Sequence, residues 1–274
     1  NVFYLCYTVF ANEQVEEGKC WGCKNPVVKK NLSQWFLKIT DYADRLLADL
    51  DHMPGWPERV KIMQRNWIGR SIGTQFFFHV DGMEDTIPVY TTRVDTVYGV
   101  TYMVLAPEHP LVEKLIANNP EKDKLQKFIN EMKNQNDLIR TAEDTPKLGM
   151  PTGSFAIHPL TGERVPIWIA NYVLYEYGTG AVMAVPEGDQ RDWEFAKKYN
   201  LPIKMVIQNK ECSLKLEEMD KAYDADGYLV NSGEFDGLSS EDARVRITQK
   251  LEKIEIGKEK VNYRLRDWLI SRQR

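Results

Sequence analysis

The stretch that decides the fold is GTGAVMAVPEGDQRDWEFAKKY, at residues 178–199. It opens with a glycine-flanked turn, continues as the short apolar segment 181–185 and breaks at the turn 186–188. From Asp189 onward, apolar residues recur at the spacing of a helix. The stretch therefore predicts a turn, a buried strand, a tight turn and a helix. Such an arrangement often builds a ligand site, because free backbone N–H groups and carboxylates are held there in fixed positions.

Two carboxylates, Asp189 and Asp192, lie three positions apart on the first turn of the predicted helix, where they are neighbours. A structural interpretation makes Asp189 the N-cap and places Asp192 at N3, where both accept bonds from helix-start N–H groups. A functional interpretation makes them part of a binding site. The two residues alone do not decide between these alternatives.

A second polar segment, TTRVDTVYGVT at 91–101, lies between two predicted strands, 87–90 and 102–106. A threonine cluster alone usually reflects β-propensity. This turn, however, combines hydroxyl groups with a cation and an anion, a mixture that suits a small polar substrate with an amino group and an ester. Its members are Thr91, Thr92, Arg93, Asp95 and Thr96.

Together, TTRVDT at 91–96 and GTGAVMAVPEGDQRDWEFAKKYNLPIK at 178–204 resemble the editing (connective-peptide) insertion of bacterial-type leucyl-tRNA synthetases. Isoleucyl- and valyl-tRNA synthetases have related insertions, but the flanking segments favour the leucyl family. Those segments, which resemble that enzyme in the same order, are LSQWFLKITDYADRLL at 32–47, WPERVKIMQRNWIGRS at 56–71, VLAPEHPLV at 104–112 and RDWLISRQR at 266–274.

The resemblance implies an α/β fold. We expect a compact, mixed, β-barrel-like editing body surrounded by short helices, with flanking segments that lead to a class I catalytic core absent from this chain. The expected parts are a degenerate zinc-module-like segment at 1–31, a helical linker at 32–73, the editing domain at 74–258 and a return strand at 259–274. Within them, apolar spacing predicts helices over 32–50 and 57–65, a hairpin over 154–174 and a capped helix over 239–254.

The resemblance also implies post-transfer editing, in which a wrong amino acid such as norvaline or isoleucine is hydrolysed from tRNA(Leu). Such an ester is reactive, so the site needs a held carbonyl, a positioned water and a recognised amino group. By resemblance, Asp192 pairs with the α-ammonium of the substrate, and Asp189 supports the loop or the terminal ribose. Thr91 and Thr92 hold the substrate and the attacking water, and Thr96 excludes leucine by crowding its side chain. The other substrate-binding positions implied are Arg93, Tyr177, Met183 and Val185.

Two departures from the family pattern leave an alternative open. Val94 replaces a proline that is common in the threonine turn, and Gly188 replaces a histidine that is common before the first aspartate. Loss of the histidine implies weaker binding, reduced editing or a compensating role for Glu187. The alternative is therefore a catalytically weak domain that binds the tRNA acceptor end or scaffolds the synthetase.

Cysteine spacing raises the question of a metal. CWGC at 20–23 has the C-x-x-C spacing of a structural zinc site formed by Cys20 and Cys23, and Cys6 offers a third thiolate. A closed zinc site needs four ligands. By resemblance, Phe3 stands where the zinc module of the family has its first zinc ligand. Zinc is therefore possible but not expected, and editing implies no cofactor. An unrelated zinc-knuckle nucleic-acid binder is a third hypothesis, against which the net charge of −4 argues.

Length and composition limit the class of protein and the partners that can be expected. At 274 residues, with 43% hydrophobic and 28% charged residues, the chain can bury a sizeable core. It has no Walker loop and neither ATP signature of a class I synthetase, so ATP is expected to be used only by the absent core. Without a signal peptide or membrane span, a cytoplasmic protein with no membrane contact is expected. The expected partners are the acceptor end of tRNA(Leu) and the rest of the leucyl-tRNA synthetase, bound by local contacts because the net charge is −4.

Overall fold

The computed structural model describes residues 15–16, 19–25, 27, 33–135, 140, 145–175 and 178–270. The chain divides into two compact units, the first comprising 1–72, 134–136 and 260–274 and the second comprising 73–133 and 137–259. The expected limits of the editing domain, 74 and 258, lie beside the limits of the second unit. None of the helices in the described part of the chain is long and apolar enough to cross a membrane.

The first unit corrects one helix prediction. Where a helix was expected over 32–50, Phe36–Leu37 forms a strand, β3, and the α-helix begins only at Ala43, after a short 3-10 helix. The reason is long-range, since β3 pairs antiparallel with Trp268–Leu269, and this pairing overrides the local helical pattern. The elements of this unit are β1 (Val15–Glu16), β2 (Lys19–Cys20), β3, η2 (Ile39–Tyr42), α1 (Ala43–Asp51), α2 (Glu58–Ile68) and β13 (Trp268–Leu269).

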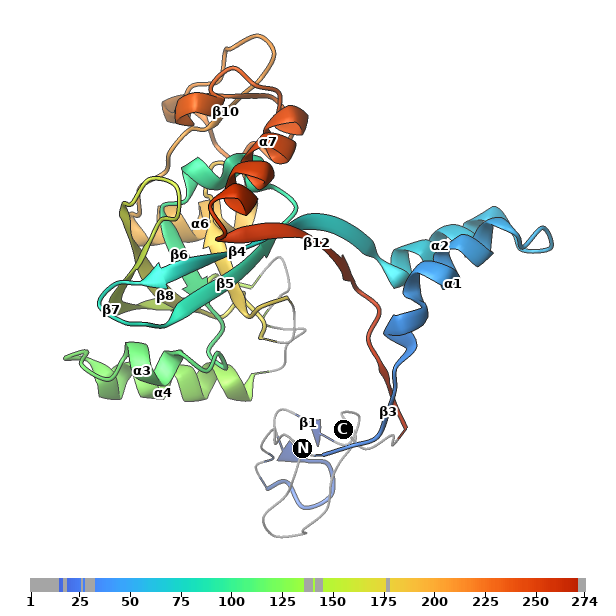
Figure 1. Ribbon diagram of the computed structural model, residues 1–274. Coiled ribbons are helices and arrows are strands. Elements are labelled where there is room, and N and C mark those ends of the chain that lie inside the picture. The colour runs from blue at the N-terminus through green and yellow to red at the C-terminus, as the bar shows by residue number, and fades with distance from the viewer. Residues whose placement is uncertain are drawn as a thin grey trace. The chain divides into compact units, whose positions relative to one another are not determined.

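The second unit is built on a seven-stranded mixed sheet (Figure 1). The strands of this sheet are β4 (Arg70–Val80), β5 (Thr86–Thr91), β6 (Tyr102–Leu105), β7 (Gly149–Ile157), β8 (Arg164–Ala170), β9 (Ala181–Ala184) and β12 (Gly257–Tyr263). The start of β4, at 70–72, and the end of β12, at 260–263, belong to the first unit. The strands follow the order β12-β4-β7-β8-β6-β9, with β5 beside β4. The predicted hairpin is confirmed, because β7 and β8 pair antiparallel. His158, in the turn of that hairpin, is buried with its Nε2 2.9 Å from the carbonyl oxygen of Val97.

The expected barrel-like closure is not seen. Among the described residues, no ladder joins β9 to β12 or to β5, so the sheet stays open. Strand β4 shows why: it pairs with β5 through six residues but with β7 only through His79 and Val80. The sheet therefore branches at β4, whereas a barrel needs a continuous stagger of ladders around its circumference.

Short helices surround the sheet, as Figure 1 shows, with α3 and α4 along one side and α7 and β10 on the opposite side. The helices are α3 (Val112–Leu115), α4 (Lys122–Asn134), α6 (Gln190–Tyr199) and α7 (Ser240–Lys253). The predicted cap of α7 is confirmed, because the Ser239 hydroxyl accepts from the N–H of Asp242. Between α6 and α7 runs an excursion that contains β10 (Ile207–Gln208), η4 (Leu216–Glu218), β11 (Tyr228–Leu229) and η5 (Gly233–Phe235).

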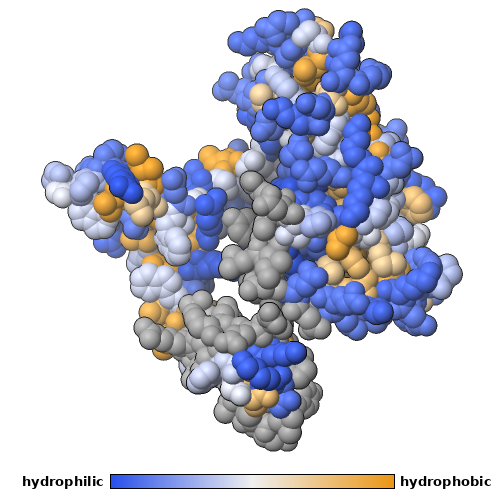
Figure 2. All heavy atoms as spheres, turned by 180° about the vertical axis from the view of Figure 1, so that it is seen from behind, coloured by the Kyte–Doolittle hydropathy of each residue, from blue (hydrophilic) through white to orange (hydrophobic). Residues whose placement is uncertain are grey.

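Two apolar clusters fill the second unit, and side chains of β6 enter them alternately, as expected for the two faces of a strand. Met103 and Leu105 belong to the larger cluster. Tyr102 and Val104 belong to the smaller one, which includes Phe195 of α6. Helix α6 therefore packs against β6 through the smaller cluster. The outside of the second unit is mostly hydrophilic on the face shown in Figure 2.

Candidate functional site

The two polar segments singled out in the sequence meet at one end of the sheet. Strand β6 pairs antiparallel with β9, with Tyr102 opposite Ala184. The pairing brings the segment before β6, the 3-10 helix η3 (Val94–Gly99), beside the turn that follows β9. The contact is close, because a Cβ placed on Gly188 would lie 3.8 Å from Cγ2 of Thr96. The threonine turn and the start of α6 therefore form one neighbourhood.

Asp189 is the N-cap of α6, as its structural interpretation predicts. Its side chain accepts from the backbone N–H of Arg191 at 2.9 Å and of Asp192 at 3.3 Å. The Arg191 guanidinium also donates to it, at 2.9 Å to Oδ2. Burial by itself would raise the pKa of Asp189, but the bonds and charge of Arg191 and the backbone donors outweigh burial and lower that pKa. Asp189 is therefore an ionised residue that fixes the helix start.

Asp192 is a buried carboxylate with only 3% of its surface exposed. Its Oδ1 accepts from the Tyr172 hydroxyl at 2.9 Å, and its Oδ2 accepts from the N–H of Val185 at 3.0 Å. Burial and the nearby charge of Asp189 raise its pKa to about 7, although its two bonds act in the opposite direction. A cation that approached this carboxylate would be attracted strongly, because little water screens the charge.

The threonines of the turn differ in what they offer a ligand. The Thr91 hydroxyl accepts from the N–H of Arg93 at 2.9 Å, and Thr92 is exposed. The Thr96 hydroxyl donates to the Arg93 carbonyl at 2.9 Å, and the residue is buried. With this hydroxyl engaged in the turn, the group that Thr96 presents toward Gly188 is its methyl carbon. Thr96 thus acts there as an apolar, space-filling residue.

Arg93 holds the turn together with ionic bonds. Its guanidinium lies 3.1 Å from Oδ2 of Asp95, which is fully buried, and donates to the carbonyl of Asp224 at 2.8 Å. Arg244 of α7 also pairs with Asp95, at 3.2 Å. Asp95 therefore joins the threonine turn to α7, and Arg93 joins that turn to the excursion. The substrate-binding role given to Arg93 by resemblance stays a prediction.

The remaining predicted binding residues lie on and around β9. Met183 and Val185 are buried and contribute to the larger apolar cluster. Val185 also touches the site, since a Cβ on Gly188 would lie 3.9 Å from its Cγ1. Tyr177 lies outside the described residues, as does Cys6.

Glu187 is a buried residue whose partners the sequence does not reveal. Its carboxylate accepts from the N–H of Val206 at 2.7 Å and of Ile207 at 3.2 Å, and its carbonyl accepts from the N–H of Tyr223 at 2.7 Å. Burial raises the pKa of Glu187 to about 7, although the bonds from the N–H groups of Val206 and Ile207 act to lower it. Val206 in turn packs on the threonine turn, because a Cβ on Gly99 would lie 2.7 Å from its Cγ2. Glu187 therefore fastens the excursion to the site.

The described residues offer only part of a zinc site. Cys20 is buried and Cys23 is exposed in the same turn, where the N–H of Lys24 donates to the carbonyl of Cys20 at 2.9 Å. No group of three or more metal-binding side chains occurs in the part of the chain that the structure describes. Two thiolates fall short of the four ligands that a structural zinc needs. The expectation about zinc stays a prediction.

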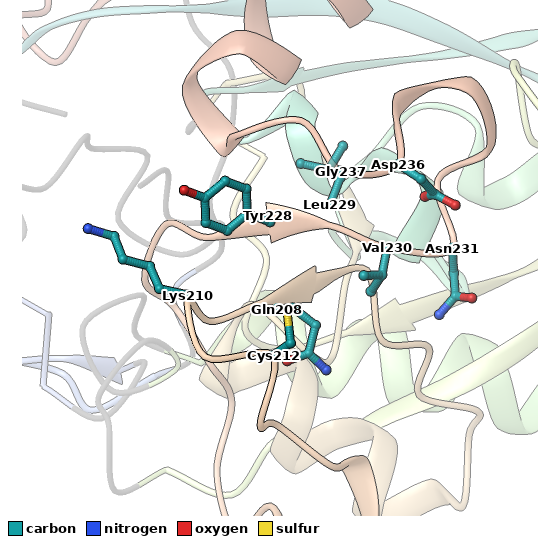
Figure 3. A pocket seen from close by; sticks show the side chains of 9 residues that line it. All are labelled: Gln208, Lys210, Cys212, Tyr228, Leu229, Val230, Asn231, Asp236 and Gly237. Carbon is teal, nitrogen blue, oxygen red and sulfur yellow. The ribbon is translucent and has the colours of Figure 1, made fainter.

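A separate cleft lies in the excursion, around β10 and β11 (Figure 3). Its volume is about 580 Å³. None of its lining residues is among the predicted site residues. They are Gln208, Lys210, Cys212, Tyr228, Leu229, Val230, Asn231, Asp236 and Gly237.

The fold and site define an α/β domain in which a threonine turn and a carboxylate-bearing helix start share one end of an open sheet. Residues 65–252 match the family described as "Leucyl-tRNA synthetase, editing domain". The chain belongs to this family of leucyl-tRNA synthetase editing domains.

Known relatives agree with this membership. The chain is 55% identical over 275 residues to a leucine--tRNA ligase of Nitratidesulfovibrio vulgaris, covering 98% of this chain and 33% of that protein. It is 54% identical over 269 residues to the leucine--tRNA ligase of Thermotoga maritima, covering 98% of this chain and 32% of that protein. The crystal structure of an Agrobacterium radiobacter leucyl-tRNA synthetase in a ternary complex with tRNA and LeuAMS matches with a TM-score of 0.70 and 35% identity, over 98% of this chain and 30% of that one. The chain thus spans about a third of the length of these relatives.

Proposed function

We propose that this chain carries the hydrolytic editing site of a leucyl-tRNA synthetase and cleaves the ester bond of mischarged aminoacyl-tRNA(Leu). The observation that carries the proposal is the meeting of the threonine turn and the start of α6, where Thr96 and Gly188 are neighbours. A single aminoacyl ester placed there can contact hydroxyls, a carboxylate and an apolar wall together.

The chemistry needs little more than positioning. The substrate ester is already activated, so the protein has to hold its carbonyl, its amino group and a water in line. Asp192 binds the α-ammonium, with a charge-assisted bond about twice as strong as a neutral one. Among the described residues, each oxygen of Asp192 has one donor, and we infer that the remaining lone pair on each accepts from the ammonium. Thr91 and Thr92 hold the ester and the attacking water.

Selection against leucine is steric. A synthetic site separates side chains that differ by one methylene by only about 1–3 kcal/mol, so a second sieve is needed. The Thr96 methyl narrows the space beside Gly188. We propose that norvaline and isoleucine esters fit this space and that the leucine ester does not. Met183 and Val185 supply the apolar wall.

The partners follow from the substrate. The acceptor end of tRNA(Leu) delivers the ester, and the rest of the synthetase holds the tRNA body. The ternary complex with tRNA that this chain resembles supports this proposal. Because the net charge of the chain is −4, its own contacts with the tRNA are local.

A second candidate function is binding without efficient hydrolysis. Gly188, where the family commonly has a histidine, favours it, because no side chain at this position contacts the substrate. The domain would then hold the acceptor end and leave mischarged tRNA intact.

Hydrolysis of norvalyl-tRNA(Leu) separates the two functions. The proposal predicts release of norvaline by the chain and a loss of about 10–100-fold in the Asp192→Ala variant, which lacks a hydrogen bond to a charged group. Asp242→Ala is a matched control, because Asp242 also lies three residues after an N-cap, Ser239, on α7. Binding of the tRNA without norvaline release above that of the buffer would favour the second candidate.

A further inference from the structure

A pair of buried tyrosines surrounds Asp192 on the side of the smaller apolar cluster. The Tyr172 hydroxyl donates to Oδ1 of Asp192 at 2.9 Å, and the Tyr102 hydroxyl donates to its main-chain carbonyl at 3.0 Å. Both tyrosines belong to the smaller cluster with Phe195. One residue of α6 is thus held by its side chain and by its backbone at the same time.

The segment that carries Tyr172 is itself firmly held. The guanidinium of the fully buried Arg140 donates to the carbonyl of Asn171 and to the carbonyl of Val173, each at 3.0 Å. The Asn171 side chain accepts from the N–H of Leu148 at 2.9 Å. The residues on both sides of Tyr172 therefore have fixed backbones, and the phenol has little freedom to move away from Asp192.

The packing of the Tyr172 ring also fixes its direction. Only 5% of the residue is exposed, and the ring centroid lies 5.5 Å from that of Phe195. Burial, followed by the charge of Asp192, raises the pKa of the Tyr172 phenol well above its ordinary value. The phenol therefore keeps its proton at neutral pH and stays a donor to the carboxylate.

We propose that Tyr172 is a positioning residue of the editing site, which orients the Asp192 carboxylate toward the α-ammonium of the substrate and favours its ionised form. The inference rests on the proposed function, because it assigns Asp192 the ammonium. Tyr172 acts through one oxygen of Asp192, and the N–H of Val185 holds the other. Together the two donors set the plane of the carboxylate, so that the free lone pairs have fixed directions.

The electrostatic part of this role depends on every group that faces Asp192. In the part of the chain that the structure describes, these are Asp189 at the N-cap of α6, Arg191 on α6, Tyr172 after β8 and Tyr102 on β6. Asp189 opposes ionisation of Asp192, whereas Arg191 and the Tyr172 bond favour it. Removal of the Tyr172 hydroxyl leaves Asp189 and Arg191 in place, and the carboxylate then takes up a proton more readily.

The first experiment titrates Asp192 directly by NMR, in the chain labelled with ¹³C at the aspartate carboxyl groups, with Asp192→Asn to assign the signal. In Tyr172→Phe the pKa of Asp192 should rise by about one pH unit, since a hydrogen bond to a charged group contributes roughly 1.5–3 kcal/mol. Tyr199→Phe is the matched control: it removes a hydroxyl from the same aromatic group, 4.6 Å from Phe195, but that hydroxyl bonds the N–H of Gly149. It should leave the Asp192 titration unchanged.

A second variant keeps the Tyr172 ring and should shift the pKa of Asp192 in the opposite direction. With 3-fluorotyrosine at position 172, the hydroxyl remains but is more acidic and donates more strongly, so the pKa of Asp192 should fall below that of the wild type. This variant retains the shape of the native side chain and tests the inference even where Tyr172→Phe does not fold. An Asp192 pKa that is the same in wild type, Tyr172→Phe and the fluorinated chain would overturn the inference.

A functional measurement separates this inference from the proposed function. In Tyr172→Phe the acid limb of norvalyl-tRNA(Leu) hydrolysis should move upward with the Asp192 pKa, which reduces the rate about five-fold at pH 7 and little at pH 9. An equal loss at both pH values would contradict a positioning role through Asp192. If the wild type hydrolyses nothing while the NMR shifts occur as stated, the proposed function fails and the Tyr172–Asp192 coupling stands.

Discussion

Thr96 and Gly188 are neighbours in the candidate site, where a Cβ on Gly188 would lie 3.8 Å from the Thr96 methyl carbon. The Thr96 hydroxyl is engaged with the Arg93 carbonyl at 2.9 Å. The steric and the hydrogen-bonding parts of this threonine therefore point to different neighbours. The methyl and the hydroxyl of Thr96 can therefore be removed one at a time by substitution.

Thr96→Ser removes the methyl and keeps the hydroxyl bond to the Arg93 carbonyl. We expect this variant to hydrolyse correctly charged leucyl-tRNA(Leu), because the space beside Gly188 becomes wider. Thr96→Val keeps a methyl in place and loses the hydroxyl, so it should still spare leucyl-tRNA(Leu). The measurement is the rate of leucine release by each variant. Release by the valine variant but not by the serine variant would show that the gate is not steric.

Gly188→Ala tests whether the turn needs glycine. The new Cβ would meet its nearest atoms, on Thr96, Val185 and Tyr223, at 3.8–4.0 Å, which is ordinary van der Waals contact. We expect the free energy of unfolding to rise by about 0.4–1 kcal/mol, because alanine restricts the unfolded chain more than glycine does. Urea denaturation checks the value. Destabilisation by more than about 1 kcal/mol would mean that the turn has no room for a side chain.

Asp192 should make the stability of the chain depend on pH. Its pKa is about 7 in the folded protein and about 3.9 when unfolded. Because the pKa of Asp192 is higher in the folded chain, its protonated form favours folding. This stabilisation of the folded chain is fully present below about pH 4 and is lost as pH rises through about 7. A pKa change of one pH unit corresponds to roughly 1.4 kcal/mol, so the raised pKa of Asp192 changes the free energy of unfolding by at most about 4 kcal/mol.

Asp192→Asn isolates that contribution. The variant should become progressively more stable than the wild type between about pH 4 and pH 7. Urea unfolding at a series of pH values measures the difference. Asp189→Asn should behave oppositely, because the pKa of Asp189 is lowered in the folded chain and its ionised form favours folding. A pH-independent difference between wild type and Asp192→Asn would contradict the burial of an ionisable Asp192.

Glu187→Ala should loosen the excursion where it meets the site. The N–H groups of Val206 and Ile207 lose their acceptor, which costs about 1–3 kcal/mol when the groups stay buried. Amide hydrogen exchange at these two residues should become faster than in the wild type. Glu187→Gln retains an acceptor oxygen and should show a smaller effect. Unchanged exchange in the alanine variant would mean that the Glu187 carboxylate does not hold β10.

Local patterns predicted the secondary structure at the centre of the candidate site. Strand β9, helix α6 and the Asp189 cap follow from residues that lie within one continuous stretch, 178–199. Their spacing and chemistry are determined by neighbours in sequence, so they can be read without a structure. The same holds for the hairpin of β7 and β8.

Features that depend on distant partners could not be predicted in this way. The strand at Phe36–Leu37 exists because it pairs with Trp268–Leu269, and its own sequence has a helical pattern. Tyr172 shows no motif, and only the fold brings its hydroxyl to Asp192. The open edge of the sheet results from branching at β4, which no local pattern encodes.

The most direct test of the account compares hydrolysis of norvalyl-tRNA(Leu) with that of its N-acetylated form, which has no α-ammonium. The wild-type chain should cleave the free ester at least about 10-fold faster than the blocked one, because only the free ester pairs with Asp192. In Asp192→Ala this preference should disappear, with both esters cleaved at the same slow rate. Equal cleavage of the two esters by the wild type, or a preference that survives in Asp192→Ala, would contradict the claim that Asp192 and the threonine turn act on one aminoacyl ester.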